Sequence, residues 1–135
     1  MSESKQLTII QMNDIHGYYN NHPEMFIENG QEVYRNAGGF SRIASILNEV
    51  RNNHPDSVLA LDNGDTFHGT YPVVKTKGEG LIPILNELAF DAMTAHWDFA
   101  YGPKQLAKLA NQLSYPLLAC NCYLKETDEL LAVVR

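Results

Sequence analysis

The sequence lacks several features that identify whole classes of proteins. Only 2 of its 135 residues are cysteines, Cys120 and Cys122, and the single residue between them makes a disulfide between the two unfavourable. As a metal-binding Cys-x-Cys pair they have no second pair in the chain, so we expect ordinary thiols. The cysteines therefore predict neither a disulfide scaffold nor a cysteine-based metal site.

Long apolar runs and basic patches are absent as well. No apolar run approaches membrane-spanning length, and residues 1–5 lead into the first predicted strand without an apolar signal core. The 10 basic side chains are outnumbered by 16 acidic ones, which gives a formal net charge of -6. Without a basic patch to release counterions, nucleic acid is excluded as a bulk electrostatic partner. We expect a cytoplasmic protein that binds neither nucleic acid nor membranes.

What the sequence does contain is a regular alternation of strand and helix patterns. Apolar runs predict strands, and apolar residues at helical spacing predict helices. In chain order these are a strand over 7–10, a helix over 40–50, a strand over 57–61, a helix over 81–88, a strand over 91–95, a helix over 106–113 and a strand over 116–119. The order predicts an α/β fold of mostly parallel strands joined by right-handed crossover helices. Residues 18–36 match neither period and are expected to form a loop or insertion beside the site.

Residues of the types that bind metals follow three of the predicted strands. Asp14 and His16 follow the first strand, Asp65 the second and His96 the third. In an extended exit, residues i and i+2 project to the same side, so Asp14 and His16 can reach one ion. Taken alone, this Asp-x-His-Gly motif also fits an ordinary turn. Because parallel strands end at one edge of a sheet, and carboxylate and imidazole suit divalent cations, we predict that all four converge there as metal ligands.

Several longer motifs occur in a fixed order along the chain. They are residues 13–17 (Asn-Asp-Ile-His-Gly), Gly38-Gly39 opening a helix that carries Arg42, residues 63–69 (Asn-Gly-Asp-Thr-Phe-His-Gly), residues 91–94 followed by Phe99-x-Tyr101-Gly102, and residues 118–121 (Leu-Ala-Cys-Asn). Over nearly its whole length the sequence thereby resembles the calcineurin-like metallophosphoesterases. The resemblance is to the branch of 5'-nucleotidases and cyclic-nucleotide phosphodiesterases.

The resemblance implies a four-layer α/β/β/α sandwich with a two-metal site. Asp14 and His16 would bind the first ion, and Asp65 would bridge both. The implied activity is metal-dependent hydrolysis of phosphate esters, with nucleotides as the expected substrates and a water activated by the two metals as the nucleophile. The implied cofactors are two divalent ions of Mn, Fe, Zn, Mg or Ca, without an organic group. His68, after the Asp65 turn, is a further catalytic candidate, and Asn121 is a candidate for substrate binding.

The third motif departs from the family pattern, which reads Gly-Asn-His followed by Glu or Asp and Phe. When the motif is aligned on Phe99, His96 takes the place of the metal-binding Asn and Trp97 that of the His that assists the leaving group. Asp98 takes the acidic place and becomes a catalytic candidate. A local shift of the alignment at this motif would instead give His96 the role of the acid that assists the leaving group. The His-Trp-acidic-Phe variant is similar to the third motif of the manganese thiosulfohydrolases, a sister group on the same fold.

The family's remaining motifs do not occur in the sequence. A later His, a Gly-His-x-His motif and usually a C-terminal substrate domain complete the related enzymes. We therefore expect residues 1–135 to form one domain-sized unit, the N-terminal half of a catalytic domain. Three functions stay open: a phosphate-ester hydrolase, a hydrolase of a sulfur-containing ester, and a non-catalytic fragment that needs its missing half. The last would expose an apolar sheet face, and would self-associate or bind a complementing C-terminal half.

Overall fold

Four parallel strands form the central sheet. The computed structural model describes residues 5–129, and its sheet has the strand order β1 (Thr8–Met12), β4 (Val58–Asp62), β5 (Ala92–Thr94) and β6 (Leu117–Leu118). Each strand pairs in parallel with its neighbour. All four predicted strands are present, and the predicted parallel α/β fold is confirmed.

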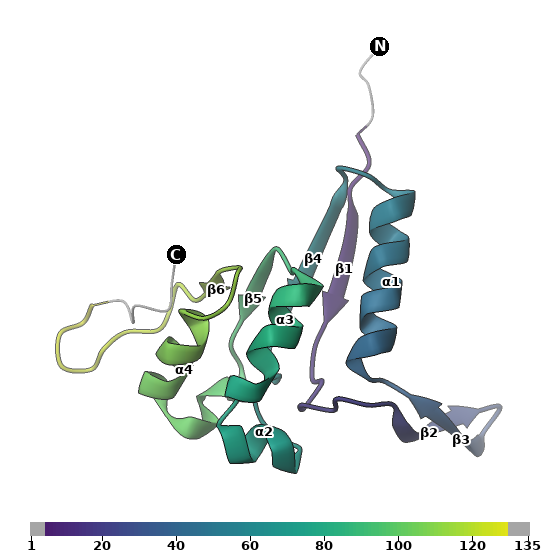
Figure 1. Ribbon diagram of the computed structural model, residues 1–135, viewed down its shortest axis with the longest axis horizontal. Helices are drawn as coiled ribbons and strands as arrows, with labels where there is room; N and C mark the ends of the chain where they lie inside the picture. The colour runs from purple at the N-terminus through teal and green to yellow at the C-terminus, as the bar shows by residue number, and fades with distance from the viewer. Residues whose placement is uncertain (1–4, 130–135) are drawn as a thin grey trace.

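Helices make the three connections between these strands, as predicted. α1 (Phe40–Asn53) joins β1 to β4, α3 (Ile82–Leu88) with the preceding 3-10 turn η1 (Glu79–Leu81) joins β4 to β5, and α4 (Pro103–Ala110) joins β5 to β6. Because the strand order in the sheet follows the chain and such crossovers are right-handed, all three helices lie on one face of the sheet (Figure 1). None of the described helices is long and apolar enough to span a membrane.

The core lies between these helices and the sheet. Alternate strand residues face the helices and meet apolar side chains of the helices. The apolar residues of these strands and three helices that are at most 2% exposed are Leu47, Ala60, Leu85, Met93, Leu106, Leu109 and Leu117. Since burying one large aliphatic side chain contributes about 1.5–3 kcal/mol, this layer fixes the strands and therefore the edge at which they end.

None of the described helices covers the opposite face of the sheet. Ile9 pairs with Leu59 in register, and both belong to this face because their neighbours in each strand face the helices. Ile9 is 61% exposed, and Leu118 at the other end of the sheet is 42% exposed. The exposed apolar surface expected for a half-domain is present, whereas self-association through it stays a prediction.

Residues 18–36, predicted as a loop or insertion, contain a β-hairpin that the sequence patterns did not indicate. β2 (His22–Glu28) and β3 (Gln31–Ala37) pair antiparallel around Asn29-Gly30, whose φ values of 51° and 78° suit a two-residue hairpin turn. The segment shows no clean alternation because exposed apolar residues occupy both faces of the ribbon, as Met25 and Phe26 do. The hairpin projects from the body of the molecule beside the start of α1 (Figure 1).

The sequence patterns also miss two short elements, α2 (Tyr71–Thr76) and the 3-10 helix η2 (Trp97–Tyr101). α2 has 6 residues and buries only Val73, so it carries too little periodic pattern to be recognised. Val73 packs against the loop after β1. A Cβ placed on Gly17 would lie 2.3 Å from Val73 Cγ2, and Gly17 has a φ of 63°. Glycine is therefore required at this position by both the backbone and the close approach.

Candidate metal centre

The loops after β1 and β4 run side by side and carry three of the predicted ligands. The Asp14 N–H donates to the Gly64 carbonyl at 3.0 Å, and the His16 N–H donates to the Asp65 carbonyl at 3.1 Å. These bonds continue the pairing of the two strands beyond their ends. They fix the ligand-bearing residues relative to one another.

The backbone at these residues is not the extended exit that the Asp-x-His spacing predicts. Asp14, His16 and Asp65 have φ values of 55°, 49° and 61°. Left-handed backbone is uncommon outside glycine, although aspartate and histidine adopt it more readily than most residues. The side chains converge because the two loops are tied together, not because they share one face of a strand.

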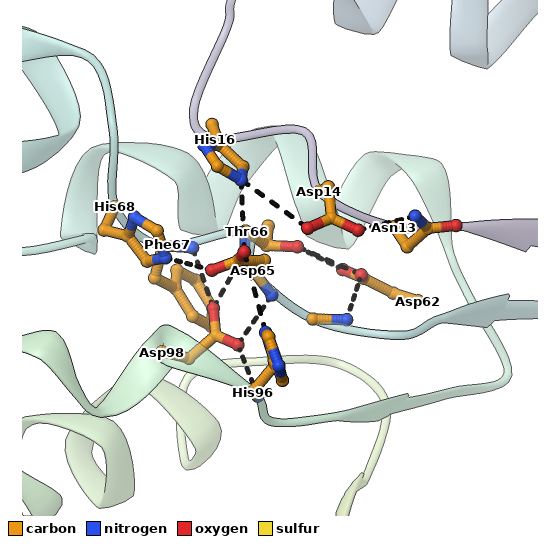
Figure 2. Close-up of polar contacts among 11 residues, drawn as sticks. Asn13, Asp14, His16, Asp62, Asp65, Thr66, Phe67, His68, His96 and Asp98 are labelled. Carbon is orange, nitrogen blue, oxygen red and sulfur yellow. Dashed lines mark hydrogen bonds and ion pairs between the residues drawn. The ribbon is translucent and has the colours of Figure 1, made fainter.

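Asp65 lies at the centre of a cluster of predicted ligands (Figure 2). His16 Nε2 is 3.1 Å from Asp65 Oδ2 and 3.6 Å from Asp14 Oδ1, and one ligand atom from each of these three residues lies within 4.8 Å of the others. His96 Nδ1 is 3.6 Å from the same Asp65 oxygen. The structure brings together all four residues predicted as metal ligands, and their binding of metal stays a prediction.

The cluster is buried at its centre and open to solvent on one side. The Asp65 side chain is 8% exposed, whereas those of His16, Asp14 and His96 are 42%, 55% and 62% exposed. A polar pocket of about 270 Å³ opens beside it. The pocket is lined by Gln11, Asn13, Asp14, Asn63, Gly64, Asp65 and His96. An ion held by Asp65 would therefore remain accessible to water and to a small anion.

The charges at this edge of the sheet favour a cation. The Asn13 side-chain amide donates to Asp14 Oδ2 at 2.6 Å and lowers the pKa of Asp14, with further contributions from Asp65 and His16. The lowered pKa keeps Asp14 in the ionised form that binds metals. Within residues 5–129, no lysine or arginine forms an ion pair with Asp14 or Asp65, and the side chains that contact the two carboxylates within 4.0 Å in such pairs are histidines.

His68 also contacts the central carboxylate. Its Nε2 meets Asp65 Oδ1, the oxygen that does not face His16, and the ring centroids of His16 and His68 are 5.1 Å apart. The His68 side chain is 21% exposed. The structure thus places this catalytic candidate in the cluster, and its role in catalysis stays a prediction.

Asp98 lies on the side of Asp65 that is away from His16 (Figure 2). It is not among the residues that line the pocket. It is 1% exposed. Its carboxylate accepts hydrogen bonds from the backbone N–H groups of Asp65, Thr66, Phe67 and His96. Because the carboxylate is enclosed and fully hydrogen-bonded, its placement does not support the catalytic role predicted for Asp98.

The sequence patterns do not single out Asp62, the last residue of β4. It is 1% exposed and accepts hydrogen bonds from the Gly64 N–H at 3.0 Å and from the Thr66 hydroxyl at 3.0 and 3.1 Å. Burial raises the pKa of Asp62 to about 6, the charge of Asp98 adds to this effect, and the two hydrogen bonds oppose it. The available signal was an aspartate two residues before a glycine at a strand end, a spacing typical of Asx-turns.

Two other positions lie at the margin of the cluster or away from it. Asn121 follows β6, is exposed and is not among the residues that line the pocket, so the structure does not bring it to the predicted ligands. Trp97 is 66% exposed, and its ring meets that of His96 edge-on with centroids 6.5 Å apart. The geometry of His96 is compatible with both of its predicted roles.

Sequence comparison relates the chain to 5'-nucleotidases. No family model matches it. It is 31% identical over 117 residues to a NAD 5'-nucleotidase of Haemophilus influenzae and 33% identical over 121 residues to a snake venom 5'-nucleotidase of Gloydius brevicauda. The matches cover 86% and 87% of this chain but 19% and 20% of the two relatives. The chain thus spans about a fifth of the length of these curated relatives.

Solved structures show the same relationship in three dimensions. The NAD nucleotidase of Haemophilus influenzae superimposes with a TM-score of 0.78 at 29% identity, over 90% of this chain and 22% of that one. A calcineurin-like phosphoesterase of Bacillus subtilis, YfkN, superimposes with a TM-score of 0.62 at 25% identity, over 83% of this chain and 36% of that one. The sulfate thiohydrolase SoxB of Thermus thermophilus superimposes with a TM-score of 0.79 at 16% identity, over 96% of this chain and 32% of that one. At this identity the likeness shows the fold alone.

Proposed function

Because the chain belongs to the calcineurin-like phosphoesterases and is homologous to 5'-nucleotidases, we propose that it supplies part of the metal site of a phosphate-ester hydrolase. The observation that carries the proposal is the cluster of Asp14, His16 and Asp65 at the carboxyl edge of the parallel sheet. This edge is where open α/β sheets bind their ligands.

The donor set supports a divalent cation at this place. Two carboxylates with imidazole suit Mn²⁺, Fe²⁺ or Zn²⁺. Oδ2 of Asp65 lies 3.1 Å from His16 Nε2 and 3.6 Å from His96 Nδ1, so Asp65 is adjacent to both histidines proposed as ligands. Ions held there would supply the positive charge that polarises a phosphoryl group and activates water. We propose Asp14, His16 and Asp65 for one ion, with Asp65 and His96 contributing to the second.

A nucleotide is the substrate that we propose for the complete enzyme. The similarity of the chain to a NAD 5'-nucleotidase and to a snake venom 5'-nucleotidase supports this proposal. The polar pocket, at about 270 Å³, lies below the roughly 300–1,000 Å³ of sites that enclose a drug-sized ligand. It suits a phosphoryl group, so the sugar and base would be bound outside it.

A sulfur-containing ester is the second candidate. It is favoured by the alignment on Phe99, which puts Trp97 at the position of the leaving-group His, because an indole N–H cannot act as an acid near neutral pH. The loss of an acid at this position would slow the hydrolysis of substrates with poor leaving groups most. The structural likeness to the sulfate thiohydrolase concerns the fold and adds nothing about the substrate.

Titration calorimetry with Mn²⁺ tests the metal site in the chain itself. We expect binding that is weakened by Asp14→Asn and by His16→Ala. Asp56→Asn is a matched control, because Asp56 has a left-handed backbone with a φ of 62° and lies outside the cluster. Equal affinity of all variants, or no binding by the wild-type chain, would contradict the proposal. Hydrolysis of p-nitrophenyl phosphate, a nucleotide and a thiosulfonate then separates the substrate classes.

A further inference from the structure

The position of Asp65 depends on an unusual backbone. Asp65 has a φ of 61°, in the left-handed region that residues other than glycine seldom adopt, and Gly64 before it has a φ of 87°. Such a conformation persists only where the surroundings enforce it. The position of the Asp65 side chain, at the centre of the candidate metal site, therefore depends on the contacts that hold its loop.

Asp98 holds this loop from one side. Its Oδ1 accepts the N–H groups of Thr66 and Phe67, each at 2.9 Å, and its Oδ2 accepts those of Asp65 at 2.9 Å and His96 at 3.0 Å. A carboxylate surrounded by backbone N–H groups makes strong, charge-assisted hydrogen bonds. The single side chain thereby ties together the backbones of two candidate ligands that lie on different loops.

Asp62 holds the same loop from the other side. It accepts the Gly64 N–H and the Thr66 hydroxyl, while the Thr66 N–H donates to Asp98 (Figure 2). Thr66 is thus fixed by both carboxylates at once. The loop is also packed tightly here, since a Cβ on Gly64 would lie 2.8 Å from Asp98 Oδ2.

We propose that Asp98 and Asp62 are positioning residues that together hold Asp65 and His96 in the geometry for binding metal before any metal arrives. We call the two a carboxylate clamp. The proposal rests on the proposed metal site. Both carboxylates are 1% exposed, and neither lines the pocket. Within residues 5–129 neither carboxylate forms an ion pair, and all of their hydrogen-bond donors belong to residues 64–67 and His96.

Amide hydrogen exchange in the metal-free chain tests the clamp directly. Asp98→Asn replaces one acceptor oxygen by an N–H donor that would face backbone donors. We expect the amides of Asp65, Thr66 and Phe67 to exchange about tenfold faster or more, the factor that corresponds to losing one hydrogen bond. Asp91→Asn is the matched control, because Asp91 also accepts a backbone N–H, that of Ala60 at 2.7 Å, away from this loop.

Mn²⁺ affinity measured by calorimetry gives the second readout. Changing a residue that orients a ligand typically weakens metal binding by about 10- to 100-fold, and we expect this for Asp98→Asn. Asp62→Ala should weaken binding more than Asp62→Asn, whose side-chain oxygen can still accept from Gly64 and Thr66. Asp91→Asn should leave affinity unchanged. If Asp98→Asn fails to fold by circular dichroism, Asp62→Ala and Thr66→Val provide the same comparison in a folded chain.

The two measurements distinguish a failure of the carboxylate clamp from a failure of the proposed metal site. Unchanged amide exchange and unchanged Mn²⁺ affinity in folded Asp98 and Asp62 variants would overturn the clamp while leaving the metal site intact. A wild-type chain that binds no Mn²⁺ would overturn the proposed function, and the exchange rates of the metal-free variants would still decide whether the two carboxylates hold the loop.

Discussion

At the scale of single residues, Asp62 links the stability of the fold to pH. Burial raises its pKa to about 6 from the ordinary 3.8, so between these values the folded state keeps a proton that the unfolded chain has lost. The contribution of Asp62 to the free energy of unfolding is therefore greatest below about pH 4, and it falls by up to about 3 kcal/mol as the pH rises through 6.

Urea denaturation of the metal-free chain between pH 4 and pH 7 measures this effect. Asp62→Asn is the reference, because its neutral amide cannot titrate. The free energy of unfolding of the wild type, relative to that of the variant, should decline across the range. A constant difference would show that Asp62 does not titrate there.

We predict that Trp97 and His96 influence which substrates the complete enzyme can cleave. Trp97→His should restore an acid next to the leaving group, and general-acid assistance is worth about 10²- to 10⁴-fold. Turnover of a nucleotide, with its poor alkoxide leaving group, should rise much more than that of p-nitrophenyl phosphate, in a preparation that hydrolyses both. Equal changes for the two substrates would argue against Trp97 at the leaving-group position.

His96→Ala distinguishes the two roles predicted for this histidine. As a ligand, His96 should be needed for full Mn²⁺ occupancy, measured by elemental analysis after dialysis. If the variant keeps its metal and selectively slows the nucleotide, His96 acts as the acid.

The candidate ligands were predictable from the sequence, and the groups that hold them were not. Asp14, His16, Asp65 and His96 follow strands of one parallel sheet, and the carboxyl ends of such strands meet. Asp62 is marked only by a spacing typical of Asx-turns and Asp98 only by its place in the third motif, and neither signal shows that the carboxylate is buried. Their burial depends on packing that only the fold defines.

At the scale of elements, the loop after β1 and helix α2 depend on one close contact. Gly17→Ala should destabilise the fold, because it combines a φ of 63° with a Cβ 2.3 Å from Val73 Cγ2. Forcing an extra methyl into a packed site typically costs about 1–3 kcal/mol. Thermal unfolding followed by circular dichroism measures the change.

A matched variant separates the clash from the backbone strain. Gly30→Ala also places alanine at a positive φ, 78°, but in open space. It should destabilise the chain less than Gly17→Ala, and adding Val73→Ala to Gly17→Ala should recover part of the loss. Equal effects at Gly17 and Gly30 would mean that the contact with Val73 is unimportant.

The elements that the sequence predicted well are those that bury a single continuous face. α1 shows a clear helical period, β4 is an uninterrupted apolar run, and both contribute to the core. The hairpin β2–β3 has exposed apolar side chains on both faces, which hides its alternation, and only Asn29-Gly30 marked the turn. α2 is too short for its one buried residue, Val73, to form a pattern.

At the scale of the whole molecule, the uncovered sheet face should cause self-association. Ile9 and Leu118 on this face are 61% and 42% exposed, and exposed apolar patches tend to pair. Sedimentation should show concentration-dependent association that Ile9→Lys reduces. Ile27→Lys is the matched control, because Ile27 is 63% exposed on the hairpin. A stable monomer at all concentrations would contradict this prediction.

We propose above all that Asp14, His16 and Asp65 form a metal site within this chain. Anomalous diffraction from crystals grown with Mn²⁺ tests it most directly, because the signal locates the ion without reference to activity. We predict an anomalous peak bounded by these three side chains. Crystals saturated with Mn²⁺ that show no peak at this cluster, or peaks only at surface carboxylates elsewhere, would contradict the account.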